Sequence, residues 1–242
     1  MRSYPRDVAG AVVLACFLTP LPATCADEAG FVPIFDGKSL DGWHAVPEGS
    51  GSDWSVRDGV IVGQGSADRL AYLVWKDAKL RDFELRFQYR LPGTGNTGVE
   101  IRARPDKTGK RPFEGYHADL GHVGIGPHIL GAWDFHFAER KEYPCPRGTR
   151  LFIDKAGRTR AEKVAEPVTL DDINEHDWNR VRVIAKRNHF RFFINGKPAS
   201  EFTDDAEVGG LDRGAIGLQI HDKGMTVKFK DVRLKAEPMA FE

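Results

Sequence analysis

The stretch that decides the fold class is Asp82-Phe83-Glu84-Leu85-Arg86-Phe87-Gln88-Tyr89-Arg90-Leu91. Apolar side chains occupy every second position in it. This period of two is that of a β-strand with one buried face. Residues 178–186 repeat the alternation, and Asn195-Gly196 further on is a strong signal for a two-residue hairpin turn. Helical periodicity is nearly absent, so the sequence predicts an all-β protein.

About a dozen such strands follow one another, with turn residues every ~8–12 positions, and this spacing is typical of a two-sheet β-sandwich or jelly roll. A slip in the alternation at Asp231 predicts a β-bulge in the last strand. One short capped helix is expected from Thr169 to Glu175. Trp43 and Trp54 lie in apolar strands and are expected in the core. Neither a repeat nor a linker divides the chain, so we expect one domain.

The N-terminus is typical of a targeting segment. A basic start and a short apolar run precede a small-x-small pattern, which predicts a secretory signal peptide over residues 1–26, cleaved after Ala26. The apolar run is too short to span a membrane. A lipoprotein signal is disfavoured, because Thr24 precedes Cys25 where a smaller residue is usual. We therefore expect residues 27–242 to be a soluble periplasmic or secreted domain.

Charge and cysteine content exclude several classes of protein. The chain has 35 basic and 35 acidic residues, hence a formal net charge of 0. No overall attraction to nucleic acid or to an anionic membrane is expected from such a balance. Cys145 is the single cysteine in residues 27–242, so an internal disulfide is not expected in the mature domain. Burial of a core must stabilise the fold, and a chain of this length suffices for that.

Three predicted strands carry functional side chains on the face opposite their apolar residues. They are residues 99–103, 116–120 and 216–221. Residues two apart in a strand share a face. The polar face therefore presents, in chain order, Glu100, Arg102, His117, Asp119, Gln219 and His221. Two histidines, two acids, an arginine and an amide indicate a site. The alternative is that three unrelated strand faces meet solvent.

Residues 105–150 form the irregular part of the sequence. They include His117, His122, His128 and His136, and only residues 116–120 and 132–135 look like strands. Long excursions from a sandwich often carry function, so we expect them to wall the mouth of the polar face. The alternative is that this segment lies on the protein surface and has no functional role. Trp133 lies here and is a candidate for stacking on a sugar ring.

Several sequence motifs indicate more than the fold class. They are Phe35-Asp36-Gly37-Lys38-Ser39-Leu40-Asp41-Gly42-Trp43, Trp54-Ser55-Val56-Arg57-Asp58-Gly59, Gly95-Asn96-Thr97-Gly98-Val99-Glu100-Ile101-Arg102, Gly115-Tyr116-His117-Ala118-Asp119 and Gly214-Ala215-Ile216-Gly217-Leu218-Gln219-Ile220-His221. In this order and at these spacings the motifs resemble the 3-keto-disaccharide hydrolase domain. The resemblance runs from about Phe31 to Lys235, over nearly all of the predicted mature chain.

The resemblance implies a concanavalin-like jelly roll, often exported, that acts on sugars whose C3 hydroxyl has been oxidised to a ketone. The chain departs from the usual pattern at three places. Thr97 replaces a serine, and His117 stands where Glu or Gln is common. Trp133-Asp134 follows Gly131-Ala132 in place of the usual tyrosine. The change at His117 alters the expected acid–base group.

A C3 ketone makes the C2 proton acidic, so a base can remove it and the C1 substituent can leave; water then adds to the enone. The base needs a pKa near the working pH, which an imidazole has, so His117 or His221 is the candidate. Glu100 is the candidate acid. Asp119 shares the face of His117 and is placed to orient it. These four residues are the predicted catalytic group.

Other residues are candidates for binding the substrate or a cation. Arg102 and Gln219 are candidate donors to sugar oxygens or an enolate, Trp133 is a candidate stacking group, and Asn96 and Asp134 are further candidates for binding substrate. A possible divalent metal ion has candidate ligands in His117, Asp119, His221 and Glu100, although no compact ligand motif is present and no cofactor is certain.

An exported carbohydrate-active enzyme that cleaves 3-keto-glycosides is the first functional hypothesis, and its partner is an oligosaccharide or glycoside substrate. A glycosidase with Glu100 and Asp119 as a directly acting carboxylate pair ranks lower. A non-catalytic lectin-like module is the alternative from another class, since the same sandwich serves lectins. A pure binder would favour exposed aromatics, Asn and Asp over titratable pairs. The polar face therefore favours the enzyme.

Overall fold

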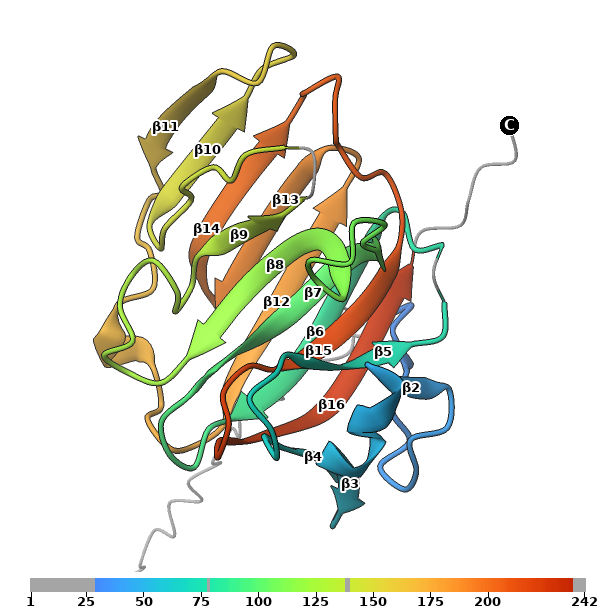
Figure 1. Ribbon diagram of the computed structural model, residues 1–242. Coiled ribbons are helices and arrows are strands. Elements are labelled where there is room, and N and C mark those ends of the chain that lie inside the picture. Colours follow the sequence, from blue (N-terminus) through green and yellow to red (C-terminus); the bar gives the residue numbers. More distant parts are fainter. Residues whose placement is uncertain (1–28, 78, 138–139, 237–242) are drawn as a thin grey trace, which may run out of the picture. The chain divides into compact units, whose positions relative to one another are not determined.

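The computed structural model describes residues 29–77, 79–137 and 140–236. Within them sixteen strands form one ten-stranded and one six-stranded sheet, and the two sheets pack face to face with the core between them (Figure 1). The prediction of a two-sheet β-sandwich is therefore confirmed. The predicted signal peptide, residues 1–26, lies outside the described residues.

The ten-stranded sheet lies behind in Figure 1. Its strands, in spatial order, are β11 (Thr159–Lys163), β10 (Thr149–Ile153), β14 (Lys197–Asp204), β13 (His189–Ile194), β12 (Asn179–Lys186), β6 (Phe83–Arg90), β16 (Thr226–Ala236), β4 (Val60–Gln64) and β3 (Trp54–Arg57), and β1 (Val32–Pro33) pairs with β16.

The six-stranded sheet lies in front. Its order is β2 (Trp43–Val46), β5 (Ala71–Trp75), β15 (Ala215–Ile220), β7 (Asn96–Pro105), β8 (Phe113–Gly121) and β9 (Trp133–His136). The predicted capped helix is reduced to the 3₁₀ turn η2 (Leu170–Asp172), which Thr169 and Asp172 close with a capping box. A second such turn, η1 (Glu48–Asp53), precedes β3.

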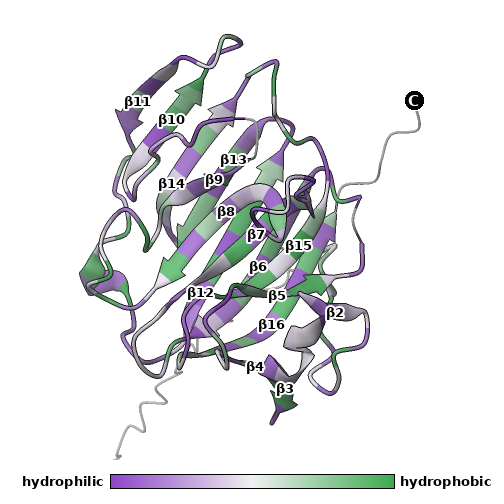
Figure 2. Ribbon diagram, in the orientation of Figure 1, coloured by the Kyte–Doolittle hydropathy of each residue, from purple (hydrophilic) through white to green (hydrophobic). Residues whose placement is uncertain are grey.

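The period-two pattern that predicts the strands also decides which side of each is buried. Along β6 buried and half-buried residues alternate without a break. Figure 2 shows the corresponding change between hydrophobic and hydrophilic colours along the strands. Trp43 and Trp54 lie in the core, as predicted. Asn195 and Gly196 both have positive φ, which the hairpin turn between β13 and β14 requires.

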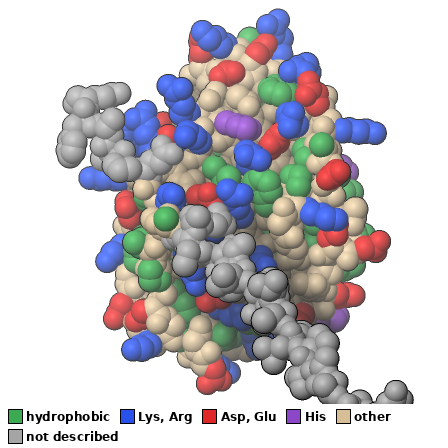
Figure 3. Space-filling view, turned by 180° about the vertical axis from the view of Figure 1, so that it is seen from behind, with side chains coloured by type: hydrophobic (Ala, Val, Ile, Leu, Met, Phe, Trp, Pro, Cys, Tyr) green, Lys and Arg blue, Asp and Glu red, His purple; other side chains and the backbone are tan. Residues whose placement is uncertain are grey.

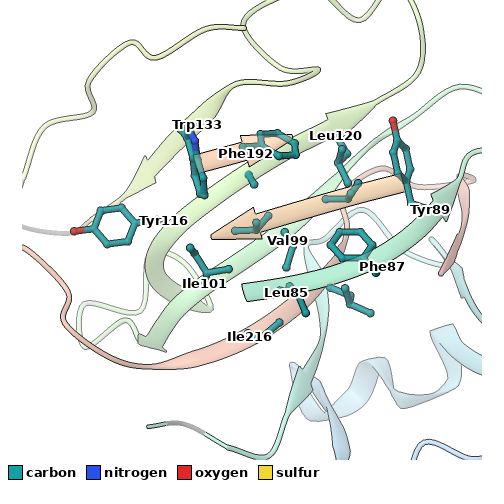
Figure 4. Packing of buried hydrophobic residues seen from close by; sticks show 14 of the residues in the cluster. Leu85, Phe87, Tyr89, Val99, Ile101, Tyr116, Leu120, Trp133, Phe192 and Ile216 are labelled. Atoms are coloured by element: carbon teal, nitrogen blue, oxygen red, sulfur yellow. The ribbon is translucent and has the colours of Figure 1, made fainter. Parts of the chain in front are cut away.

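Trp133 also belongs to the core, so its predicted role in stacking on a sugar is wrong. It is 2% exposed, and its indole N–H donates to the backbone carbonyl of Ser200. Figure 4 shows the ring next to Phe192, and the two ring centroids are 5.8 Å apart. Because Trp133 faces inward, the next residue, Asp134, faces outward.

Two of the irregularities in strand pairing bear on the predictions. The one predicted near Asp231 is present in β16, where the register shifts between Lys230 and Arg233. A second bulge, in β7, turns Arg102 away from the face it was predicted to share with Glu100. Arg102 has φ of +48° and is 2% exposed.

The Arg102 guanidinium makes hydrogen bonds in the protein interior and lies away from the polar face. It donates to the carbonyls of Arg81 and Leu211, and it stacks over the ring of Phe190 at 4.6 Å. The prediction that Arg102 binds substrate is therefore wrong. Alternation alone could not foresee this, because one extra residue in a strand moves every later side chain to the other face.

Tyr116 on β8 joins the core to the loop before β15. Its ring packs on Phe202, and its hydroxyl donates to Asp204 Oδ2 at 2.7 Å. The hydroxyl also accepts from the backbone N–H of Leu211 at 3.2 Å. Arg140 donates to both oxygens of Asp204 at 2.7 and 2.9 Å. This network fixes the start of β8, which carries the functional residues described below.

We expect Tyr116→Phe to lower the free energy of unfolding by about 1–3 kcal/mol, because it removes a buried hydrogen bond to Asp204 and leaves the buried N–H of Leu211 without its acceptor. Tyr89→Phe is the matched control: among the described residues the Tyr89 hydroxyl is buried without a hydrogen-bond partner. That substitution should leave stability unchanged or raise it. Urea unfolding measures both, and equal losses in the two variants would contradict this assignment.

Candidate active site

The functional side chains lie on the outer face of the six-stranded sheet, in two adjacent cross-strand rows. In one row Glu100 on β7 pairs with His117 on β8, which pairs with Asp134 on β9. In the next row Gly98 pairs with Asp119. The alternation of β7 and β8 points all of these residues away from the core. Three strands therefore bring Glu100, His117, Asp119 and Asp134 together.

Glu100 is at the centre of the cluster and is completely buried. Its Oε2 lies 2.8 Å from Nδ1 of His117 and 3.0 Å from Nδ1 of His136. The two imidazole rings are stacked, with centroids 5.0 Å apart. One carboxylate oxygen therefore accepts from two imidazoles, which come from different strands.

Each imidazole has a second carboxyl group at its other nitrogen. Nε2 of His136 lies 3.2 Å from Asp134 Oδ2. Nε2 of His117 lies 3.4 Å from Asp119 Oδ1, yet it has no hydrogen-bond partner among the described residues. Glu100 Oε1 is likewise buried and without a partner there. Buried polar atoms are normally satisfied, so these two atoms are suited to a ligand.

Two glycines make room for the unpaired atoms. A Cβ at position 98 would lie 2.3 Å from His117 Nε2, and one at position 115 would lie 2.2 Å from Glu100 Oε1. Neither glycine has positive φ, so the reason for glycine is space and not backbone conformation. Gly98 keeps the sheet surface open in front of His117.

Charge is strongly organised within the cluster. Burial raises the pKa of Glu100, but the charge of His136 and the hydrogen bonds from both imidazoles outweigh this and hold the pKa at about 2. Burial lowers the pKa of His136, but the charge of Glu100 and the hydrogen bond to Asp134 raise it to about 10. The hydrogen bond and charge of His136 likewise lower the pKa of Asp134 to about 2, against the effect of burial. His136 is thus an imidazolium between two carboxylates.

In the other pair, His117 and Asp119, both pKa shifts favour the neutral form of the side chain. Burial lowers the pKa of His117 despite its hydrogen bond to Glu100. Burial and the charge of Asp134 raise the pKa of Asp119 well above its usual range. Because ionised Glu100 can only accept, Nδ1 of His117 carries the proton and Nε2 keeps a lone pair. A base and an acid therefore lie 3.4 Å apart.

Glu100, His117 and His136 also form a set of three possible metal ligands, whose donor atoms all lie within 4.8 Å of one another. Two imidazole nitrogens and a carboxylate oxygen suit a divalent transition ion and leave coordination positions for substrate. Asp134 and Asp119 would then be the outer carboxylates that orient metal-binding histidines. The donor set and its second layer therefore fit an ion.

The predicted residues Gln219 and Asn96 share the outer face with this cluster. Gln219 Nε2 donates to the hydroxyl of Tyr72 at 2.9 Å, and its Oε1 is buried without a partner among the described residues. Gln219 follows Leu218, which pairs with Val99, so it lies beside Gly98. Asn96 lies two residues further along β7 and has an unpaired buried Oδ1 as well.

His221 does not join the cluster, contrary to its prediction as a base and metal ligand. It follows β15 by one residue, is 43% exposed at its side chain, and its Nδ1 lies 2.7 Å from Asp222 Oδ1. Gly217, not His221, is the β15 residue opposite Glu100. Four residues of strand separate the two, or ~13 Å.

Sequence reasoning missed His136 as a member of the site. The available signal was its position two residues after Asp134, which places both on one face of a strand. The predicted strand ended at Phe135, one residue short of His136. Tyr72, which binds Gln219, carried no signal because it lies inside a continuous apolar run.

Comparison with known proteins identifies the family of this chain. Residues 30–235 match the 3-keto-alpha-glucoside-1,2-lyase-like domain family. The chain belongs to that family, and membership of it gives the protein a carbohydrate-active role.

One curated relative and two solved structures are similar to this chain. The chain is 32% identical to a 3-keto-disaccharide hydrolase of Bacteroides thetaiotaomicron, over 86% of this chain and 79% of the relative. Two solved structures share the fold: a putative glycosyl hydrolase from Parabacteroides distasonis (TM-score 0.61, 21% identity, 87% and 95% of the two chains) and the carbohydrate-binding module CBM66 from Bacillus subtilis (TM-score 0.51, 15% identity, 81% and 96%). Among the described residues no helix is long and apolar enough to cross a membrane.

Alanine at position 98 should perturb the cluster, because its Cβ would overlap His117 Nε2. We expect Gly98→Ala to lower the free energy of unfolding by about 1–3 kcal/mol. Gly49→Ala is the control, since a Cβ there meets no atom within 4 Å. Thermal unfolding of both variants checks this. An unchanged free energy of unfolding in Gly98→Ala would show that the space between position 98 and His117 is not tightly packed.

In metal-free protein, His136 should stay protonated well above neutral pH because its folded pKa of about 10 exceeds the ordinary histidine pKa of 6.5. Its contribution to stability is then complete below pH 6.5 and is lost as the pH rises through 10. NMR titration of the imidazole nitrogens in the presence of a chelator measures this directly. A titration of His136 near pH 6.5 would contradict the ion-pair arrangement.

Proposed function

We propose that the protein cleaves glycosides whose sugar ring carries a ketone at C3, by removing the C2 proton and expelling the C1 substituent. The observation that carries the proposal is the pair of His117 and Asp119, one proton donor and one proton acceptor, buried side by side on the polar sheet face. Family membership supports the substrate class. Water then adds to the enone, so that the net reaction is hydrolysis.

The proposed proton transfers balance within this pair. The lone pair of His117 Nε2 takes the proton from C2, and the electrons of that bond pass to the C3 oxygen as an enolate. When the enolate collapses, the bond from C1 to the leaving oxygen breaks, and Asp119 gives that oxygen its proton. Addition of water reverses the roles: Asp119 takes a proton from water as the oxygen attacks C1, and His117 returns a proton to C2.

The enolate needs a positive charge close to the C3 oxygen. In the ion-free protein the His136 imidazolium is the positive group of the cluster, held by Glu100 and Asp134. Glu100 is unsuited to the role of acid that the sequence suggested, because its low pKa keeps it ionised. It acts instead on the two imidazoles, fixing the orientation and proton position of His117.

We further propose that a divalent ion binds Glu100, His117 and His136. Such an ion would supply the positive charge that stabilises the enolate oxygen. With Nδ1 of His117 bound, the ring proton would move to Nε2 and face Asp119. Asp119 would then be the base and His117 the acid. The pair keeps one donor and one acceptor in either state.

His117→Gln and Asp119→Asn should each lower kcat on a C3-oxidised glycoside by about 10²–10⁴-fold, since each removes a proton-transfer group. His221→Gln is the matched control: it also removes a histidine from the predicted polar face, but one outside the cluster, so turnover should stay near that of the wild type. Release of the C1 substituent measures the rate. Full turnover in both His117→Gln and Asp119→Asn would contradict the assignment of these two residues as proton-transfer groups.

Elemental analysis tests the ion. We expect one divalent ion per chain, loss of activity after a chelator removes it, and recovery on adding it back. His136→Ala should weaken ion binding, whereas His221→Ala should not. An ion-free protein that keeps full activity in chelator would contradict the metal proposal and leave the imidazolium as the charge.

A further inference from the structure

The outer face of the ten-stranded sheet is strongly basic, although the whole chain has a formal net charge of 0. Figure 3 looks onto this side of the molecule, where Lys and Arg side chains are spread among acidic and hydrophobic ones. Five strands of the ten-stranded sheet, β10, β13, β12, β6 and β16, carry cations at half-buried or exposed positions: Arg150, Arg191, Arg180, Arg182, Lys186, Arg86, Arg90, Lys228, Lys230, Arg233 and Lys235. We call this the basic face.

Strand register places some of these cations directly opposite one another. Arg182 pairs with Arg86, and Arg86 pairs with Arg233, so three arginines lie in one row across β12, β6 and β16. Lys228 pairs with Arg90 in a neighbouring row. Like charges directly opposite in a sheet destabilise it. Stability of the sheet therefore does not explain why cations stand opposite one another in two neighbouring rows.

Acids are fewer than cations on these strands, and two of them, Glu84 and Glu201, are each shared between two arginines. Glu84 accepts from both Arg86 and Arg182 and is 17% exposed at its side chain, against 42% for Arg182. Glu201 contacts both Arg150 and Arg191 and is 9% exposed, against 43% and 44% for the two arginines. Each carboxylate therefore holds two guanidinium groups in place and leaves an excess positive charge towards solvent.

Aromatic rings hold further cations of the basic face. The Phe193 ring lies between the guanidinium groups of Arg182 and Arg191, 5.2 and 4.8 Å from its centroid. Lys230 Nζ lies 4.1 Å from the Trp178 ring centroid. Fixed guanidinium groups lose less entropy when they bind carboxylate or sulfate, and their fork geometry suits such groups.

We propose that the basic face binds an anionic polysaccharide, one that carries carboxylate or sulfate groups, and so holds the enzyme near carbohydrate on the side opposite its active site. A single-stranded nucleic acid needs open aromatic faces on which bases stack, and here cations lie over the rings of Phe193 and Trp178. Membrane binding needs apolar side chains to insert. Among the described residues the exposed large apolar side chains are Val32, Leu170 and Val208, and of these Val32 alone, on β1 opposite Leu234 of β16, is on a strand that pairs with the basic face.

Affinity electrophoresis of the whole protein in gels that contain polygalacturonate tests the proposal, with neutral dextran as the reference polymer. The test variant is Arg180→Gln/Arg191→Gln/Lys228→Gln. The matched control carries the same change in charge at exposed loop lysines: Lys38→Gln/Lys79→Gln/Lys155→Gln. We expect retardation by polygalacturonate and not by dextran, weaker at high salt. The test variant should bind about a hundredfold more weakly and the control as the wild type does.

Both variants should cleave a C3-oxidised glycoside at the wild-type rate, because the substitutions lie outside the active site. Retained cleavage also shows that they fold. The proposal is overturned if the wild type is not retarded, or if the control variant loses as much affinity as the test variant. Tighter binding to single-stranded DNA or to anionic phospholipid vesicles than to polygalacturonate would overturn it as well.

Discussion

The buried carboxylate of Glu100 is the constraint on which the rest of the site depends. It lies completely inside the protein, so it must be compensated, and two imidazoles from neighbouring strands do this through one oxygen. Their Nδ1 atoms are thereby fixed, and their Nε2 atoms face Asp119 and Asp134. A single buried charge thus sets the direction of both rings and raises the pKa of His136. Gly98 and Gly115 make the arrangement sterically possible.

The sandwich supports this cluster through strand register. Because β7, β8 and β9 are neighbours, side chains far apart in sequence stand in one row, as Glu100, His117 and Asp134 do. Their inward neighbours, among them Tyr116, fix the strands by packing and hydrogen bonds. The same alternation on the other sheet points the basic face outward. Core stability and both functional surfaces therefore come from one periodic pattern.

Much of this was predictable from the sequence, because period two decides both secondary structure and facing. The sandwich, the hairpin at Asn195-Gly196 and the shared face of Glu100, His117 and Asp119 all follow from it. The errors arose where alternation alone does not suffice. A bulge redirected Arg102 into the interior. His221 shares the face of Gln219 but lies too far along its strand, and distance along a face cannot be read without register.

Product analysis by mass spectrometry tests the central claim most directly. The purified protein would be incubated with a set of C3-oxidised glycosides and, in parallel, with their unoxidised parents. The account predicts cleavage of the oxidised set alone, with a product lighter by one water, the enone, appearing before the hydrated sugar. Cleavage of the unoxidised parents at the same rate would contradict it, and so would sugar binding without any cleavage.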